Sequence, residues 1–144
     1  MLQLAYISEA ADDFHIADLP ALMQTARKNN RNTGLTGMLL HERKMFMQIL
    51  EGDAAAIDAL LEELHADPRH KNIEIVYRND ELREREFGRW TMACKILGEK
   101  FREDFFELDE RVKRVLRNVT QVSGDQARQL LLEFRDIERT YIDI

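Results

Sequence analysis

Two short apolar runs separated by a three-residue polar turn limit the fold of this chain more than any other feature. The first run covers Leu35 to His41 and follows Gly34, and the second covers Met45 to Leu50. Between them stand only Glu42, Arg43 and Lys44. Apolar runs of strand length joined by so short a connection are typical of an antiparallel β-hairpin. The fold is therefore expected to contain a sheet.

Strand and helix patterns alternate around this hairpin. Leu2, Leu4 and Tyr6 alternate with other residues at strand period, and two later runs also predict strands, Ile73 to Tyr77 and a strand within Phe87 to Ile96. Helical spacing of apolar residues follows Asp18 and again follows Asp53, and each of these aspartates is expected to be an N-cap. The order β-α-β-β-α-β-β predicts an α+β fold with both helices on one face of the sheet.

The character of the sequence changes after Gly98. Residues 101–119 are charged and helical in pattern, and Ser123 to Gln126 resembles a capping box that opens a last helix. We therefore divide the chain into a core, residues 1–97, and a C-terminal two-helix extension, residues 98–144.

Charge and cysteine content exclude several classes of function. The net charge of −6 opposes binding to a phosphate backbone, and the arginines near residue 85 alternate with glutamates. A single cysteine forms no internal disulfide, which suits a reducing compartment. No apolar run approaches the roughly 20 residues that cross a bilayer, and the amino end lacks a signal-peptide pattern. We expect a cytoplasmic protein that binds neither nucleic acid nor membrane.

Several polar residues stand where the pattern asks for apolar ones. Gln48 interrupts the run Met45 to Leu50, so it is either buried beside a partner or faces water from an edge strand; the spacing leaves both open. Tyr6 fits the common case of a core tyrosine whose hydroxyl is bonded to the backbone. Asn29 and Asn30 fit a helix C-cap, and Trp90 and Met92, two apart on the last strand, fit a core position.

The sequence offers no enzyme motif. His65 and His70 have no matching pair of metal ligands elsewhere, and Cys94 stands on an apolar strand face as an inert buried thiol. Glycine-rich nucleotide loops and the nucleophile elbow are absent from the sequence. We expect no catalysis and no metal.

Six short segments, in order along the first 95 residues, resemble the BLUF family, the sensors of blue light using flavin. They read Y-I-S-E-A from Tyr6, N-N from Asn29, G-L-T-G-M-L from Gly34, F-M-Q-I-L-E-G from Phe46, D-P-R-H from Asp67 and F-G-R-W-T-M from Phe87. The tail is similar to that of the short, phototaxis-type members. The resemblance implies a ferredoxin-like core that binds FAD or FMN non-covalently.

The resemblance also implies a set of site residues. Those expected to contact the flavin are Tyr6, Ser8, Asn29, Asn30, Gln48, Asp67, Arg69 and His70. Those expected to act in the photochemistry are Tyr6, Gln48, Trp90 and Met92. In this hypothesis Tyr6 gives an electron to the excited flavin, a proton follows through Gln48, and the rearranged Gln48 changes one hydrogen bond to the ring.

The family resemblance implies signalling by protein contacts, from a homo-oligomer to a downstream partner. Two other functions compete with the photosensor. The first is a chromophore-free ferredoxin-like interaction module, which predicts a colourless protein. The second is a flavin reductase, which predicts that NADH bleaches the bound flavin in the dark.

Overall fold

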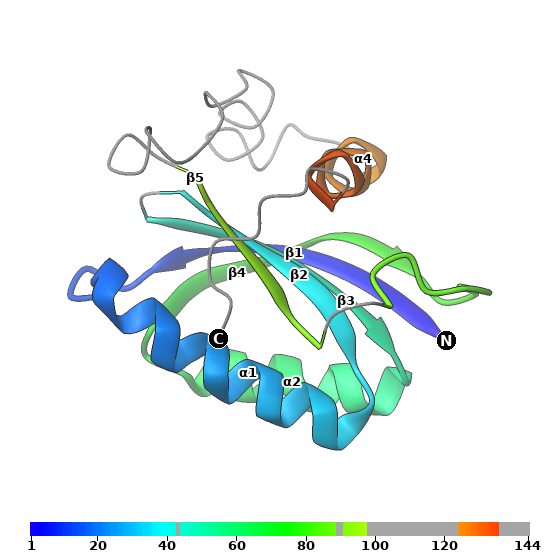
Figure 1. Cartoon of the computed structure of the whole chain (residues 1–144), viewed down its shortest axis with the longest axis horizontal. Coiled ribbons are helices and arrows are strands. Elements are labelled where there is room, and N and C mark those ends of the chain that lie inside the picture. Colours follow the sequence, from blue (N-terminus) through cyan, green and yellow to red (C-terminus); the bar gives the residue numbers. More distant parts are fainter. Residues whose placement is uncertain (43, 89–90, 98–123, 136–144) are drawn as a thin grey trace.

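A computed structural model describes residues 1–42, 44–88, 91–97 and 124–135. The helix predicted over residues 101–119 lies outside this part of the chain, and so does Trp90. The described residues form an open five-stranded sheet with helices on both faces (Figure 1). Helices α1 (Leu19–Thr33) and α2 (Ala54–Ala66) cover one face, and α4 (Gly124–Arg135) lies on the other.

The strands follow the order β4-β1-β3-β2-β5 across the sheet. Neighbouring strands run antiparallel except β2 and β5, which are parallel. This arrangement confirms the predicted α+β, ferredoxin-like order of elements. The strands are β1 (Leu2–Ala10), β2 (Thr36–Glu42), β3 (Met45–Gly52), β4 (His70–Asn79) and β5 (Ala93–Leu97).

The predicted hairpin is formed by β2 and β3, and β3 lies inside the sheet. Gln48 stands opposite Tyr6 of β1 and opposite Leu39 of β2. Its side chain is only 6% exposed. The alternative in which Gln48 faces water from an edge strand is therefore wrong.

The two helices of the first face begin in different ways. The Asp53 side chain accepts a hydrogen bond from the Ala56 backbone N–H at 3.3 Å and so caps α2 as predicted. Asp18 stands at the N-cap position of α1 but makes no capping bond. A 3-10 turn, η1 (Ile16–Asp18), precedes α1, and there the Asp18 carboxylate accepts from the His15 backbone N–H instead.

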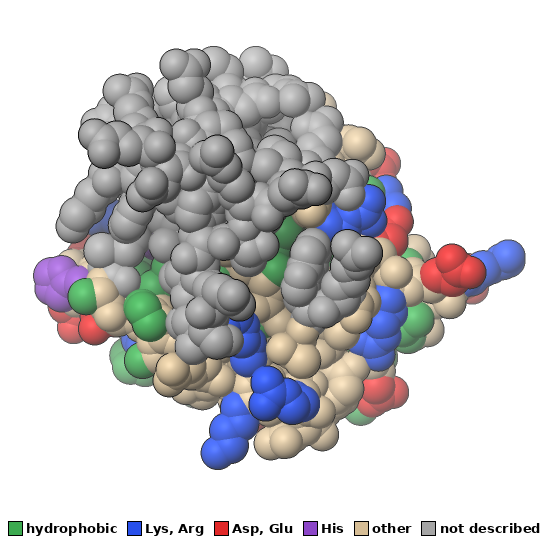
Figure 2. Space-filling model, viewed as in Figure 1, with side chains coloured by type: hydrophobic (Ala, Val, Ile, Leu, Met, Phe, Trp, Pro, Cys, Tyr) green, Lys and Arg blue, Asp and Glu red, His purple; other side chains and the backbone are tan. Residues whose placement is uncertain are grey.

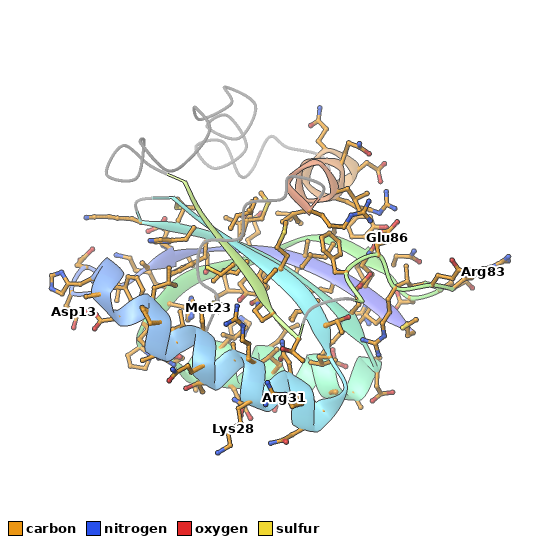
Figure 3. All side chains as sticks on the ribbon, viewed as in Figure 1. Asp13, Met23, Lys28, Arg31, Arg83 and Glu86 are labelled. Carbon is orange, nitrogen blue, oxygen red and sulfur yellow. The ribbon has the colours of Figure 1, made fainter. Side chains whose placement is uncertain are left out.

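The first face of the sheet carries the larger core. Leu2, Leu4 and Leu50 from the strands pack with Leu19 and Met23 of α1 and with the buried side of α2. The outer side of α1 carries Lys28 and Arg31, which stand out into solvent among the basic side chains on that side of the molecule (Figures 2 and 3). Helix α1 is therefore amphipathic, and its apolar stripe fixes it on the sheet.

The second face carries a separate apolar cluster under α4. Ala5, Ile7, Met47 and Ile49 alternate with the first-face residues of the same strands and are buried. Leu131 of α4, with no exposed surface, packs against them. Because both faces of the central strands are covered, these strands read as continuous apolar runs rather than strict alternations.

The last two strands differ from the sequence-based bounds. β4 extends beyond Ile73–Tyr77 because it pairs with β1 along most of its length, with two register irregularities. β5 begins only at Ala93, and Phe87 is buried in the second-face cluster rather than in a strand. Arg83 stands near the tip of the connection between the two strands (Figure 3).

His41 gives the fold a predicted weakness in acid. The ring is 2% exposed and stacks on Phe46, with centroids 4.5 Å apart. Burial lowers the pKa of His41 to about 4. An unfolded histidine titrates near pH 6.5, so as the pH falls below that value the unfolded chain takes up the proton first and stability drops. His41 alone should lower the free energy of unfolding by about 2 kcal/mol at pH 5.

Replacing His41 with phenylalanine keeps the ring and removes the titration. Urea unfolding of His41→Phe at pH 7 and pH 5 should therefore give a smaller loss of stability in acid than the wild-type protein. Equal losses in the two proteins would show that His41 does not set this dependence.

Candidate functional site

Tyr6, Gln48 and Met92 form a hydrogen-bonded row on the first face of the sheet. The Tyr6 hydroxyl donates to Gln48 Oε1, and Gln48 Nε2 donates to Met92 Sδ at 3.2 Å. All three side chains are buried. Burying an amide without partners costs about 1–3 kcal/mol, so a partner at each end of the amide explains how Gln48 is tolerated inside the sheet.

The protonation of this row is set by its burial. Burial, and then the nearby charge of Asp67, raise the pKa of Tyr6 well above its ordinary value. The phenol therefore stays protonated at neutral pH and acts as a donor. Burial likewise raises the pKa of Cys94, on the same face, to about 12, which leaves an unreactive thiol.

His70 presents an unsatisfied polar atom at this face. Ser8 Oγ lies 3.3 Å from His70 Nδ1, and the ring packs beside Phe46. His70 Nε2 is buried and has no hydrogen-bond partner among the described residues. Burial lowers the pKa of His70, which favours the neutral ring at pH 7. A buried polar atom without a partner is costly, so Nε2 is suited to a ligand that completes its hydrogen bond.

An ion pair holds the turn that precedes His70. Arg69 binds both carboxylate oxygens of Asp67, through Nε at 3.0 and 3.1 Å and through a terminal nitrogen at 2.7 Å. Hydrogen bonding from Arg69 holds the pKa of Asp67 below its usual range. The turn therefore carries a fixed charge pair next to a neutral imidazole.

The end of α1 is tied to the segment that enters β5. Asn30 Nδ2 donates to the Thr91 carbonyl at 2.6 Å, and Arg27 Nε donates to the Met92 carbonyl at 2.8 Å. Gly34, with φ of 72°, takes the left-handed position that ends α1. Because the C-cap is Gly34, the C-cap alternative is wrong for both asparagines, and the buried side chain of Asn30 instead joins two elements.

Two adjoining cavities lie along α1 and α2, and the inner one also reaches the sheet. The inner one has a volume of about 50 Å³ and is lined by Tyr6, Leu22, Met23, Ala26, Asn30, Leu39, Gln48, Leu60, Leu64 and His70. The outer one has a volume of about 170 Å³ and is lined by Asn29, Asn30, Asn32, Thr33, Leu35, Ala56, Ala59, Leu60 and Glu63. They share Asn30 and Leu60, so they are neighbouring parts of one gap between α1 and α2.

The chemistry of the gap suits a flat, mostly apolar ring with a polar edge. Leucine and methionine side chains form its walls, while Asn30, Gln48 and His70 offer hydrogen-bonding atoms. The amides supply donors and acceptors together, which matches a carbonyl–NH–carbonyl edge. The inner cavity has room for only one or two water molecules of about 30 Å³ each. A bound ring would therefore extend from the inner cavity into the outer one.

The structure places most of the predicted site residues around this gap. Tyr6, Asn30, Gln48 and His70 line the inner cavity, and Asn29 lines the outer one, although it is exposed. Met92 contacts Gln48, Ser8 lies behind His70, and Asp67 pairs with Arg69. Trp90 lies outside the described residues.

Sequence reasoning missed the contribution of α2 to the site. Leu60 and Leu64 belong to the apolar residues at helical spacing after Asp53, and both line the inner cavity. An apolar stripe looks the same whether it faces a side chain or a ligand, so the pattern held no signal for this role.

Comparisons with known proteins point to one family. A family model described as "BLUF: Sensors of blue-light using FAD" matches residues 1–93. The photoactivated adenylate cyclase subunit beta of Euglena gracilis is 38% identical over 91 residues, which is 62% of this chain and 10% of that protein. The chain thus spans about a tenth of the length of the curated relatives it matches.

Solved structures agree with the family match. "BlrB - a BLUF protein, dark state structure" is 29% identical, with a TM-score of 0.71, and the match covers 92% of both chains. The structure of a bacterial light-regulated adenylyl cyclase is 26% identical with a TM-score of 0.70, covering 93% of this chain and 36% of that one. In the second case the similar part is one portion of a larger protein.

Proposed function

The chain belongs to the BLUF family of blue-light sensors that use flavin, and on that premise we propose that Tyr6 and Gln48 form its light-driven switch. The observation that carries the proposal is the buried hydrogen bond from Tyr6 to Gln48 Oε1, beside a cavity that both residues line. A chromophore-free interaction module gives no functional reason for the buried row of Tyr6, Gln48 and Met92.

In this proposal FAD or FMN occupies the gap between α1 and α2. His70 Nε2, without a protein partner in the described part of the chain, would bind a polar atom of the ring. Asn29 and Asn30 would bond the polar edge of the ring, with Gln48 between the ring and Tyr6. Ser8 would orient His70, and Asp67 and Arg69 would lie beside the ring as a fixed pair.

Bound flavin would supply an electron acceptor that becomes strong only on excitation by blue light. Tyr6 is the proposed electron donor. A phenol that has lost an electron releases its proton readily, and the hydrogen-bonded acceptor for that proton is Gln48 Oε1. When the electron and proton return, the side-chain amide of Gln48 is left rotated or in its imidic form, so one hydrogen bond at the site has changed.

Met92 is the residue proposed to respond to this change at Gln48. In the structure the Gln48 amide group donates to the Met92 sulfur, and a thioether accepts hydrogen bonds but donates none. A rotated amide would bring Oε1 toward the sulfur, so two acceptors would meet and Met92 would move away. Arg27 and Asn30 hold the backbone at Met92 and Thr91, so that movement would pull on α1 and β5. The corresponding role for Trp90 stays a prediction.

Replacing Gln48 with leucine tests the switch. We expect Gln48→Leu to retain flavin through His70 and Asn30 but to lose the light-induced red shift, because Tyr6 has no proton acceptor. The measurement is the absorption difference before and after a blue flash. Gln24→Leu is the control, since Gln24 is a glutamine of α1 that is exposed to solvent rather than buried in this row. A normal shift in Gln48→Leu would refute the role of Gln48.

We propose further that the protein is cytoplasmic, forms a homo-oligomer and signals to another protein without catalysing a reaction. A related light-regulated adenylyl cyclase supports signalling to an effector, because the similar region occupies 36% of that chain.

In the described part of the chain, no helix combines the length and apolar character needed to cross a membrane. The proposed division is a flavin-binding core, residues 1–97, followed by an extension, residues 98–144.

A further inference from the structure

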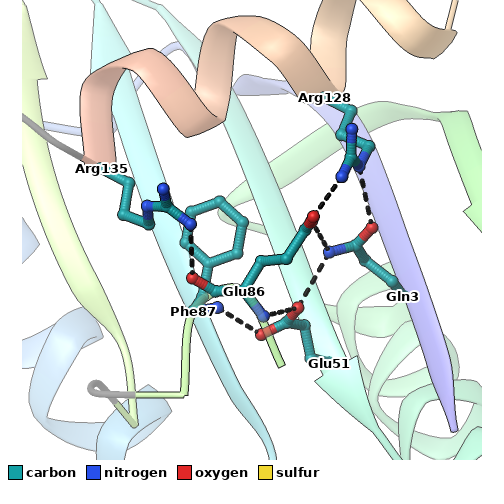
Figure 4. Close-up of polar contacts among 6 residues, drawn as sticks. All are labelled: Gln3, Glu51, Glu86, Phe87, Arg128 and Arg135. Atoms are coloured by element: carbon teal, nitrogen blue, oxygen red, sulfur yellow. Dashed lines mark hydrogen bonds and ion pairs between the residues drawn. The ribbon is translucent and has the colours of Figure 1, made fainter. Parts of the chain in front are cut away.

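A polar cluster that is buried at its centre fastens α4 to the second face of the sheet (Figure 4). We call Gln3, Glu51, Glu86 and Arg128 the Glu86 cluster; they come from β1, β3, the connection between β4 and β5, and α4. Gln3 and Glu51 have no exposed surface. Polar groups this deeply buried require full hydrogen bonding, and the cluster supplies it.

Glu51 organises the inner part of the cluster. Its carboxylate accepts from the backbone N–H groups of Glu86 at 2.8 Å and Phe87 at 2.7 Å. The Gln3 amide then bridges the two acids, donating to Glu51 at 2.8 Å and to Glu86 at 2.7 Å. The segment at residues 86–87 is therefore fixed to the central strands.

Helix α4 contacts that segment through two arginines. Arg128 makes an ion pair with the Glu86 carboxylate, and Arg135 donates to the Glu86 carbonyl at 3.0 Å. Arg135 also lies over the Phe87 ring, 6.0 Å from its centre. Leu131 lies between Arg128 and Arg135 on the same side of the helix. Residues 86–87 are therefore the segment to which α4 docks through polar contacts.

The preceding residue, Arg85, bonds to the end of α1 and to the start of β2. Arg85 donates to the Gly34 carbonyl at 2.8 Å, to Thr36 Oγ1 at 2.9 Å and to the Glu51 carbonyl at 3.0 Å. Gly34 directly follows α1, whose last turn lines the outer cavity. Residues 85–87 thus touch both the end of α1 and α4.

From this juxtaposition we propose that docking of α4 and binding of flavin are energetically coupled through residues 85–87. The inference rests on the proposed flavin site between α1 and α2. Flavin bound between these helices would contact the last turns of α1 just before Gly34, and Arg85 links Gly34 to Glu86 and so to α4. Coupling between two sites is reciprocal, so loosening α4 must weaken flavin binding by the same factor.

Two measurements on the flavin-loaded protein test the coupling. The first is hydrogen exchange of residues 124–135 in Arg128→Gln, expected to be roughly tenfold to a hundredfold faster because a charge-assisted hydrogen bond is lost. Arg78→Gln is the control, since Arg78 of β4 pairs with the exposed Asp80 that follows the strand. The second is the rate of FAD release, followed by its fluorescence, expected to rise about fivefold or more in Arg128→Gln.

Arg85→Gln supplies the decisive comparison. In that background, adding Arg128→Gln should still speed exchange in α4 but should no longer change FAD release. Unchanged exchange in Arg128→Gln would overturn the docking role, and faster exchange with unchanged FAD release would overturn the coupling. If Arg128→Gln fails to fold, Arg128→Lys should give smaller increases in the same two rates, hydrogen exchange of α4 and FAD release. A wild-type protein that binds neither FAD nor FMN would instead refute the proposed flavin site.

Discussion

Replacing Tyr6 with phenylalanine is expected to leave a yellow protein whose absorption no longer shifts after a blue flash. Phenylalanine keeps the ring that packs in the first-face core but removes the hydroxyl that donates to Gln48 Oε1. Without that hydroxyl the proposed electron donor and the proton are both lost, so the expected effect on the shift is complete. The stability cost should be about 1–3 kcal/mol, because Gln48 Oε1 is left buried without its partner.

Tyr77→Phe is the matched control for Tyr6→Phe. Tyr77 packs against the second-face cluster, on the other side of the sheet from Gln48. It should retain both flavin and the shift. A normal photocycle in Tyr6→Phe would remove Tyr6 from the mechanism, whereas a colourless variant would assign it to flavin binding instead.

Replacing Gly37 with alanine should disrupt the sheet and the site together. Gly37 lies in β2, and a Cβ there would overlap the Ile49 carbonyl oxygen and lie 3.1 Å from the Ile49 carbonyl carbon. Because the clash is with backbone of the central strand, no side chain can move to relieve it. We expect a loss of about 3 kcal/mol or more in the free energy of unfolding, a large part of the 5–15 kcal/mol typical of a domain.

Flavin binding should fall with stability in Gly37→Ala, because β3 carries Gln48. Urea unfolding and the ratio of flavin to protein measure the two effects. Gly34→Ala is an informative control: its φ is 72° but nothing lies within 4 Å of a Cβ there. It should lose only about 1–2 kcal/mol from left-handed strain. Equal effects at the two positions would show that the close approach of β2 to β3 does not decide the outcome.

Local pattern predicted much of the fold because the signals involved are short-range. The polar turn predicted the hairpin, and the helical spacing after Asp53 predicted α2 with its cap. The start of the last strand was harder to predict, because Phe87 has the apolar character of a strand residue but is buried beneath α4. Only tertiary packing separates that case from a strand.

In the candidate site, too, local pattern predicted some features and tertiary packing decided the others. Gln48 stood out in the sequence because a buried amide needs a partner, but spacing alone left its environment open. The contact from Gln48 to Met92 joins residues 44 apart in the chain, and the contact from Glu51 to Phe87 joins residues 36 apart. No local pattern encodes such pairs, so the Glu86 cluster had no signal in the sequence beyond a family-like motif at Glu51.

The most direct test of the central claim is the absorption spectrum of the purified protein before and after a blue flash, followed during recovery in the dark. The account predicts flavin bands that shift slightly to the red and then return unaided, because one hydrogen bond at the ring changes and no covalent bond forms. Flavin that only bleaches would contradict the Tyr6–Gln48 switch and favour redox chemistry. A colourless protein that also refuses added flavin would contradict the photosensor as a whole.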